Sequence, residues 1–274
     1  MVHATQTALN SVVSLWRYPV KSMMGEELNA TQVTERGLVG DRAYALVDSS
    51  DGKVATAKNP RKWPDLFDFR ATFLEPARGA RIPPVRIALP DGTTVTSDQA
   101  DVNRILSNAL GREVTLRAAG RGTVQAEEYW PDMEELDHRD TVTDFTLPEE
   151  TFFDCATIHL LTTATLDRLR ELYPLGRFEV RRFRPNIVLE LGSGERGFAE
   201  NAWVGHTLAI GAEVRLSITS PCGRCVMTTL AQGDLPQDPG ILRAAAQHNR
   251  ASVGVYAAVA RGGTIRRGDS VRIE

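Results

Sequence analysis

The sequence predicts a mixed α+β chain that is rich in β-strands, with barrel-like sheets and a few peripheral helices. Three observations support this fold class: many apolar runs have the length of a strand, turn-forming dipeptides separate several of them, and few stretches show a helical repeat. The chain has 274 residues, of which 42% are hydrophobic and 24% are charged. These values are ordinary for a globular protein with a real core, and the length allows one large domain or two smaller ones.

The first half of the chain predicts strands and one helix. Residues 1–10 are expected to form a flexible tail. Strand-like runs follow at 12–18, 42–47, 70–74 and 85–89. Asp-Gly dipeptides, which are typical of hairpin turns, stand at 51–52 and 91–92. A helix is predicted over 98–110, where Ser97 can cap the first turn and Gly111 can end the last one.

Residues 125–150 form a strongly acidic stretch that two prolines interrupt. We expect an irregular surface connection here, because a solvated acidic loop is more common than a specific cation site. The predicted domains are accordingly an N-terminal β-barrel-like domain at 11–118 and a second domain at 119–274, with the boundary between 118 and 150.

The second half predicts more strands than helices. Strands are expected at 156–161, 186–191, 207–210, 213–219, 225–230, 254–260 and 270–273. Helices are expected at 163–173 and 240–248. Many short strands with few helices favour a β-barrel that carries helices on its outside.

Composition and motifs exclude several functional classes. A net charge of -3 gives no electrostatic basis for general nucleic-acid binding. No apolar run approaches the roughly 18–20 residues that a membrane span requires, and the first residues do not have the pattern of a secretory signal. Three cysteines do not make a disulfide framework, so we expect a reduced, cytoplasmic protein. P-loop, GxSxG and HExxH motifs are absent from the sequence.

The most informative segment is SPCGRCVMTT at 220–229, which places two of the three cysteines and Arg224 within four residues. As a zinc half-site it lacks a second ligand pair, and as a redox pair it should be followed by a helix, whereas β-branched residues follow. Two buried cysteines in a turn remain an alternative. Arg224 is expected to lower the pKa of Cys225 and to favour a thiolate, which is a ligand for a soft metal.

Three further segments carry side chains that suit a phosphate or the edge of a heterocycle. These segments are YPVKS at 18–22, GLVGDR at 37–42 and RFRPN at 182–186. Their donor side chains are Lys21, Ser22, Arg42, Arg184 and Asn186. Each segment alone could equally be a salt-bridged strand end or a surface turn.

Together and in this order, the four segments resemble the MOSC family (molybdenum cofactor sulfurase C-terminal domain) preceded by its N-terminal β-barrel companion. They are most similar to the mitochondrial amidoxime-reducing component and its bacterial relatives, and the resemblance covers about residues 11–273. It implies a MOSC-type β-barrel and a mononuclear molybdenum bound to a pterin dithiolene, with Cys225 as catalytic residue and metal ligand. It also implies a set of cofactor-binding residues, namely Lys21, Ser22, Arg42, Thr162, Thr163, Arg184, Asn186, Cys222 and Arg224.

The resemblance implies a molybdenum-cofactor-dependent reductase of N-hydroxylated or N-oxygenated small molecules. Because the sequence lacks the ferredoxin cysteines that some relatives carry, electrons are expected from a separate ferredoxin- or cytochrome-type protein with its reductase. A sulfur carrier or molybdenum-cofactor delivery protein that uses a cysteine persulfide is the alternative. The pyridoxal-phosphate desulfurase domain of the sulfurases is absent from the sequence, so autonomous sulfur transfer from cysteine is not expected.

Overall fold

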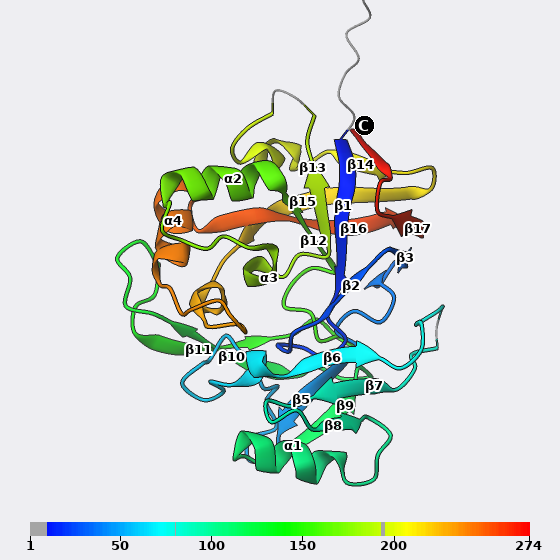
Figure 1. Ribbon diagram of the computed structural model, residues 1–274, viewed down its shortest axis with the longest axis vertical. Coiled ribbons are helices and arrows are strands. Elements are labelled where there is room, and N and C mark those ends of the chain that lie inside the picture. Colours follow the sequence, from blue (N-terminus) through cyan, green and yellow to red (C-terminus); the bar gives the residue numbers. More distant parts are fainter. Residues whose placement is uncertain (1–9, 80, 193–194) are drawn as a thin grey trace, which may run out of the picture.

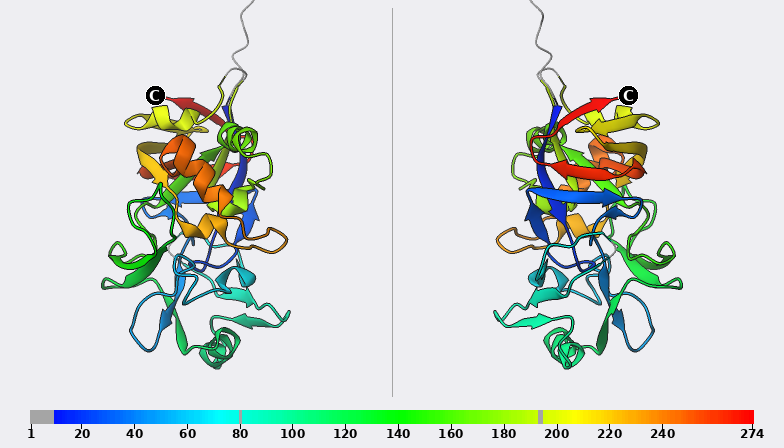
Figure 2. Two further views of the ribbon diagram at one scale, coloured as in Figure 1. Left: turned by 90° about the vertical axis from the view of Figure 1, so that its left-hand side faces the viewer. Right: turned by 90° about the vertical axis from the view of Figure 1, so that its right-hand side faces the viewer.

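The computed structural model describes residues 10–79, 81–192 and 195–274 (Figure 1). The predicted tail at 1–10 lies outside the described residues, except for Asn10, which begins the first strand. A β-barrel occupies one end of the long axis, and the smaller sheets of the first half occupy the other end (Figures 1 and 2).

Seven strands close the barrel, which confirms the predicted β-rich fold. They are β1 (Asn10–Arg17), β12 (Ile158–Thr162), β13 (Ile187–Glu190), β14 (Thr207–Ile210), β15 (Val214–Gly223), β16 (Ser252–Arg261) and β18 (Ser270–Ile273). Their order is β13-β12-β16-β15-β14-β18-β1, and β1 pairs again with β13. The first strand of the chain therefore completes a barrel whose other strands come from the second half.

Apolar side chains from opposite walls fill the barrel. Leu15, Leu160 and Leu216 belong to three different strands, and each is fully buried in the same core. Alternate side chains of a strand point to the same face, so a strand needs apolar residues only at every second position to line such a core. Each of these side chains stabilises the fold by about 1.5–3 kcal/mol.

The other end of the molecule has its own core. Its strands are β5 (Tyr44–Asp48), β6 (Arg70–Phe73), β7 (Val85–Ala88), β8 (Thr94–Thr96) and β9 (Val114–Ala118). Helix α1 (Val102–Leu110) and the 3₁₀ helix η1 (Leu66–Asp68) pack here too, and Phe67, Phe69 and Leu106 are buried between these elements. The predicted turn at 91–92 joins β7 to β8, and Gly92 has the positive φ of 85° that such a turn requires.

Short strands and helices connect and cover these two parts. The strands are β2 (Glu26–Leu28), β3 (Ala30–Thr34), β4 (Gly37–Leu38) and β17 (Gly263–Arg266). Strand β3 pairs with both β4 and β17, which joins the first half to a segment near the end of the chain. The helices are α2 (Thr163–Leu172), α3 (Val180–Phe183), α4 (Gly240–Asn249) and the 3₁₀ helix η2 (Ala199–Trp203).

The acidic stretch at 125–150 is a β-hairpin and not the irregular connection that the sequence predicted. Strands β10 (Gln125–Trp130) and β11 (Thr141–Thr146) pair over their whole length. Two causes overcome the acidic composition: Ala126 is fully buried, and Lys53 forms ion pairs with Glu127 and Asp144 at 2.9 and 2.7 Å. Glu127 and Asp144 lie directly opposite each other in the hairpin, and the lysine that pairs with both offsets the repulsion between these like charges.

The strand predicted at 225–230 is also wrong, because this segment forms the 3₁₀ helix η3 (Val226–Thr229). Strand β15 ends at Gly223, and the chain then turns toward the first half. Val226, Met227 and Leu230 are buried in the core of the first half. Tertiary burial therefore overrides the strand preference of the β-branched residues.

Helix α1 begins at Val102, later than predicted. Ser97 does not cap it, because the Ser97 hydroxyl accepts a hydrogen bond from the Val85 amide at 3.0 Å. Gly111 ends the helix in the left-handed conformation, as predicted. Within the described residues, no helix has both the length and the apolar character needed to cross a membrane.

Candidate functional site

One pocket collects most of the side chains that the sequence singled out. Its lining includes, from the first half, Lys21, Ser22 and Arg42, and from the second half, Arg184, Asn186, Arg224 and Cys225. These residues come from turns and strand ends, where the chain can present side chains to a ligand. The structure therefore brings seven of the ten predicted site residues to one place.

The backbone around the pocket is held in an unusual conformation. Ser22, Arg42 and Arg184 have φ angles of 63°, 48° and 53°, in the left-handed region that residues with a Cβ rarely adopt. Each such residue costs on the order of 1 kcal/mol or more, and strained residues persist where the surrounding structure forces them. Three of them around one pocket indicate that the positions of these side chains matter more than local backbone stability.

Lys21 and Asp154 form an ion pair in the pocket wall. The Lys21 Nζ donates to Asp154 Oδ1 at 2.5 Å and to the carbonyl oxygen of Phe152 at 2.9 Å. Lys58 lies on the other side of the carboxylate, with its Nζ 3.5 Å from Asp154 Oδ2. Burial lowers the pKa of Lys21, and although burial alone would raise the pKa of Asp154, the two lysines hold it well below its usual range.

Arg42 and Asn186 meet at the buried carboxylate of Asp41. Asp41 Oδ2 accepts hydrogen bonds from Arg42 and, at 2.8 Å, from the Asn186 side chain. Asn186 Oδ1 accepts a hydrogen bond from the His159 amide at 3.1 Å. The Asn186 side chain is thus engaged by protein groups on both sides, and it fixes the pocket wall where the two halves meet.

Arg184 places a positive charge in the pocket without an acidic partner. Its guanidinium lies over the Tyr18 ring at 4.1 Å and over the Phe67 ring at 5.4 Å, and it donates to the Met23 carbonyl at 2.7 Å. No carboxylate of the described ranges lies within ion-pair distance of it. Burial lowers the pKa of Arg184 to about 10, so it remains charged at neutral pH. A buried cation of this kind suits an anionic ligand.

Arg224 contacts Cys222, which corrects the expectation that it would favour the Cys225 thiolate. Its Nη1 lies 2.8 Å from Cys222 Sγ, and its Nη2 donates to the Phe183 carbonyl at 3.0 Å. Burial alone would raise the pKa of Cys222, but Arg224 and His159 lower it to about 6. Burial instead raises the pKa of Cys225 to about 11. The Arg224 side chain points back toward β15, and this orientation decides that it stabilises the thiolate of Cys222.

The two thiols also differ in access. Cys222 is fully buried behind the pocket wall, whereas Cys225 is half-buried and lines the pocket. The Arg224 Nε is buried and finds no hydrogen-bond acceptor within the described part of the chain. A ligand in the pocket can therefore reach Cys225 directly and can offer an acceptor near Arg224.

Thr162 and Thr163 do not lie at this pocket. Thr162 is fully buried, caps helix α2 by accepting from the Thr165 amide at 3.1 Å, and donates to Glu200 at 2.8 Å. Thr163 borders a separate surface groove with Asp167. Thr162 and Thr163 therefore form the N-terminal end of α2.

Sequence reasoning missed several pocket residues. With Lys58, five cationic side chains line the pocket. Among the lining residues, Asp154 supplies the one carboxylate. Lys58 stands in a short basic segment at 58–61, but nothing in the local sequence indicated that Asp154 or Tyr256 would line the pocket. The exposed thiol of Cys155 also lines the pocket, and Cys222 lies behind the lining in contact with Arg224.

The donor set decides which kind of metal group the pocket fits. Among the residues that the structure describes, no three His, Cys, Asp or Glu side chains gather in a way that could hold a metal ion. A metal bound here must therefore bring most of its ligands with it. The lining thiols of Cys225 and Cys155, together with five lining cations, fit a soft metal that arrives on an anionic, sulfur-containing organic ligand.

Comparisons with known proteins identify related domains and relatives. The family model described as "MOSC domain" matches residues 148–272, and the one described as "MOSC N-terminal beta barrel domain" matches residues 9–103. The chain is 28% identical over 236 residues to mitochondrial amidoxime reducing component 2 of Rattus norvegicus. This alignment covers 81% of this chain and 67% of that protein.

Other relatives are less similar or much longer. The chain is 26% identical to mitochondrial amidoxime-reducing component 1 of Homo sapiens, over 81% of this chain and 66% of that protein. It is 25% identical to molybdenum cofactor sulfurase of Oryza sativa subsp. japonica, over 84% of this chain and 30% of that protein. A solved structure, the YUAD protein from Bacillus subtilis, aligns with a TM-score of 0.49 and 11% identity over 98% of this chain and 97% of that chain.

Proposed function

Because the chain belongs to the MOSC domain family and carries the family's N-terminal beta barrel domain, we propose that it is a molybdenum-cofactor-binding reductase of N-hydroxylated or N-oxygenated small molecules. The similarity to amidoxime reducing components and to a molybdenum cofactor sulfurase supports a function connected with the molybdenum cofactor. The reaction and the electron donor are our proposal.

One observation carries the proposal: the reachable thiol of Cys225 shares a pocket with the buried cation of Arg184, which has no acidic partner among the described residues. Cys225 would bind the metal. Arg184, with Lys21 and Arg42, would bind the pterin phosphate through charge-assisted hydrogen bonds, and the Ser22 hydroxyl would add a neutral donor. Because these residues come from both halves, the halves at 11–118 and 119–274 would form one binding site.

Bound in this pocket, a molybdenum–pterin group would supply the redox chemistry that removes an oxygen atom from the substrate in a two-electron reduction. In the overall reaction the N–O bond breaks, two electrons and two protons are consumed, and the oxygen leaves as water. We propose that a separate electron-transfer protein delivers the electrons. The chain's own residues bind and orient the cofactor and keep the reacting end partly shielded from water.

Metal analysis tests this proposal directly. The protein is purified from a host that makes molybdenum cofactor, and molybdenum and pterin are measured per chain. We expect stoichiometric amounts of both, and reduction of an N-hydroxylated amidine when a reduced viologen dye supplies electrons. Cys225→Ser should lose the metal and the activity, whereas Cys155→Ser, which changes another thiol of the same pocket, should keep both.

Two results would contradict the proposal. Folded protein that contains neither molybdenum nor pterin after purification from such a host would exclude the cofactor. Cyanide-labile sulfur on a cysteine in molybdenum-free protein would favour the alternative, a sulfur carrier or cofactor delivery protein.

A further inference from the structure

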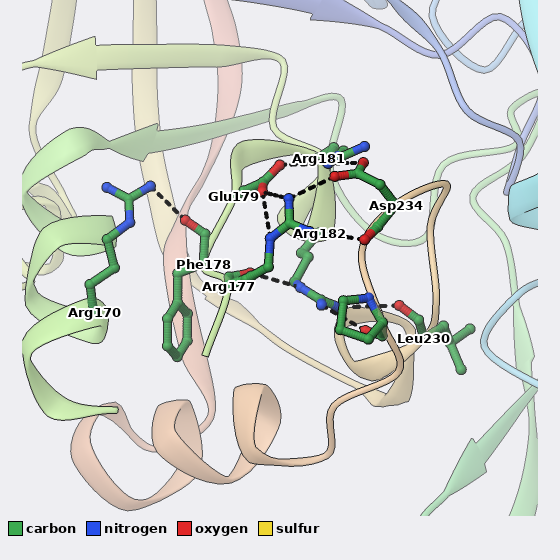
Figure 3. A network of polar contacts seen from close by, with 9 residues as sticks. Arg170, Arg177, Phe178, Glu179, Arg181, Arg182, Leu230 and Asp234 are labelled. Atoms are coloured by element: carbon green, nitrogen blue, oxygen red, sulfur yellow. Dashed lines mark hydrogen bonds and ion pairs between the residues drawn. The ribbon is translucent and has the colours of Figure 1, made fainter. Parts of the chain in front are cut away.

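Arg182 is the largest side chain that is fully buried in the described chain. Its guanidinium donates to four backbone carbonyls and to no carboxylate of the described residues, and Figure 3 shows the contacts with Arg177 and Leu230. The acceptors are the carbonyl oxygens of Arg177 at 2.9 Å, Thr228 at 3.2 Å, Leu230 at 3.1 Å and Pro236 at 2.8 Å. A buried charge is costly unless hydrogen bonds satisfy it, so this arrangement calls for an explanation.

The position of these carbonyls gives the explanation. Thr228 lies within η3 and Leu230 directly follows it, and the last carbonyls of a helix have no partner inside the helix. The planar guanidinium, with its five N–H donors in a fixed fork, can satisfy several such carbonyls at once. Arg182 therefore holds the end of the turn that follows Cys225.

Two successive hydrogen bonds connect Arg182 to Cys225. Arg182 donates to the Thr228 carbonyl, and Thr228 donates to the Cys225 carbonyl through its amide at 3.2 Å and its hydroxyl at 3.0 Å. The opposite side of the turn is held by burial of Val226 and Met227 in the core of the first half. The backbone of Cys225 is thus held from two directions.

The neighbours of Arg182 extend the same connection. The Phe183 carbonyl accepts from Arg224, and Arg184 donates to the Met23 carbonyl. Three consecutive residues therefore join the turn after Cys225, the arginine before it and the N-terminal part of the pocket wall. Movement of this short segment would displace the proposed ligand and the proposed anion-binding arginine together.

A group of ion pairs near Arg182 contributes less than its buried hydrogen bonds. Arg177 and Arg181 form ion pairs with Asp234 at 2.8 and 2.6 Å, and Glu179 bridges the two arginines (Figure 3). The Asp234 side chain is 65% exposed, and exposed ion pairs contribute about 1 kcal/mol or less. Among the polar contacts of this network, the buried guanidinium of Arg182 is therefore the main restraint on the turn.

We propose that Arg182 is a positioning residue that fixes the Cys225 thiol at the pocket wall, an inference that rests on the proposed role of Cys225 as metal ligand. Arg182 is fully buried and does not line the pocket. Its effect passes through the backbone of η3, so it determines where the sulfur lies and how far it is open to solvent.

The three cysteines allow a test on cofactor-free full-length protein. Trypsin separates them into the peptides 140–168, 216–224 and 225–243, so mass spectrometry can follow iodoacetamide labelling of each thiol independently. Cys155 reports the reagent, fully buried Cys222 reports global unfolding, and Cys225 reports the turn. The variants are Arg182→Met, Arg182→Lys and the control Arg170→Gln, in which Arg170 donates to the Phe178 carbonyl of the same network but does not contact η3.

We expect Arg182→Met to increase Cys225 labelling by about tenfold or more while Cys222 stays protected, because the turn loses charge-assisted hydrogen bonds, and tenfold corresponds to about 1.4 kcal/mol. Arg182→Lys should give a smaller increase, and Arg170→Gln none. Unchanged Cys225 labelling in folded Arg182→Met would overturn the proposal, as would equal increases at Cys222 and Cys225 in the milder Arg182→Lys. If Arg182→Met does not fold, Arg182→Lys decides alone.

The labelling result is separate from the proposed function. If wild-type protein binds no molybdenum, the function fails, but the labelling still shows whether Arg182 restrains Cys225. If the function holds, Arg182→Lys should also retain less molybdenum than the Arg170→Gln control.

Discussion

The Asn186 side chain donates a hydrogen bond of 2.8 Å to the buried carboxylate of Asp41, which lies 145 positions earlier in the chain. Asp41 also accepts from Arg42 and, at 2.8 Å, from the Tyr18 amide. One carboxylate thus fixes the strand end that precedes Lys21, the turn that carries Arg42 and the start of β13. The pocket depends on this contact between the two halves.

We predict that Asp41→Asn destabilises the protein by about 3 kcal/mol, because it leaves buried donors and the Arg42 charge without their acceptor. Asp144→Asn is the control: its carboxylate is 52% exposed beside Lys53, so its loss should cost about 1 kcal/mol or less. Urea unfolding curves measure both. Equal effects of the two substitutions would mean that the Asp41 contact does not hold the halves together.

Arg184→Ala should strongly reduce molybdenum and pterin content in protein from a cofactor-producing host. The variant loses charge-assisted hydrogen bonds worth about 1.5–3 kcal/mol each. Arg215→Ala, which removes an arginine that pairs with Glu274 on the barrel surface, should keep its cofactor. An Arg184→Ala protein with full molybdenum but a raised KM would place Arg184 on the substrate side of the pocket.

The pH dependence of alkylation should distinguish the cysteines of cofactor-free protein. Burial raises the pKa of Cys225 to about 11, so its thiolate fraction, and with it the labelling rate, should rise about tenfold per pH unit from neutral pH up to that value. Cys222 should stay protected throughout, because it is ionised but fully buried. A labelling rate of Cys225 that levels off near pH 8 would show that its thiol is not desolvated.

Asp154 should stabilise the protein in a pH-dependent way. The pKa of its carboxyl is lower in the folded protein than the usual value of about 3.9, so its contribution is complete above about pH 4 and is lost as the pH falls further. Asp154→Asn should therefore cost about 1–2 kcal/mol near neutral pH, a modest value because the side chain is 31% exposed and solvent screens the pair. Denaturation near pH 3 should show a smaller difference from wild type; a constant difference would assign the cost to packing.

Local sequence patterns predicted most barrel strands and the main helices, because alternation, caps and turn residues act over a few positions. They did not predict that β1 closes the barrel against β13, since that pairing depends on residues far apart in the chain. The strand expected after Cys225 failed for the same reason: its apolar residues are buried in a core that lies elsewhere in the sequence.

The site residues show the same difference between features that neighbouring residues determine and features that depend on distant parts of the chain. Cys225, Arg184 and Lys21 stood in recognisable segments, and the structure brings them to one pocket. The orientation of Arg224 toward Cys222 could not be deduced from adjacency, because two neighbours in sequence need not face each other. Asp154 lies in a stretch with no chemical signal, and its role at the pocket follows only from contact with Lys21.

The place of β1 in the barrel has a consequence for biosynthesis. Strand β1 pairs with β2 nearby in the sequence, but its remaining positions pair with β13 and β18 and have no partner until those strands have been translated. At about 5–20 residues per second, this delay is on the order of ten seconds or more. During that time the nascent chain exposes a strand that invites aggregation or chaperone capture. The pocket, whose lining extends to Tyr256, therefore cannot be complete before most of the second half has been translated.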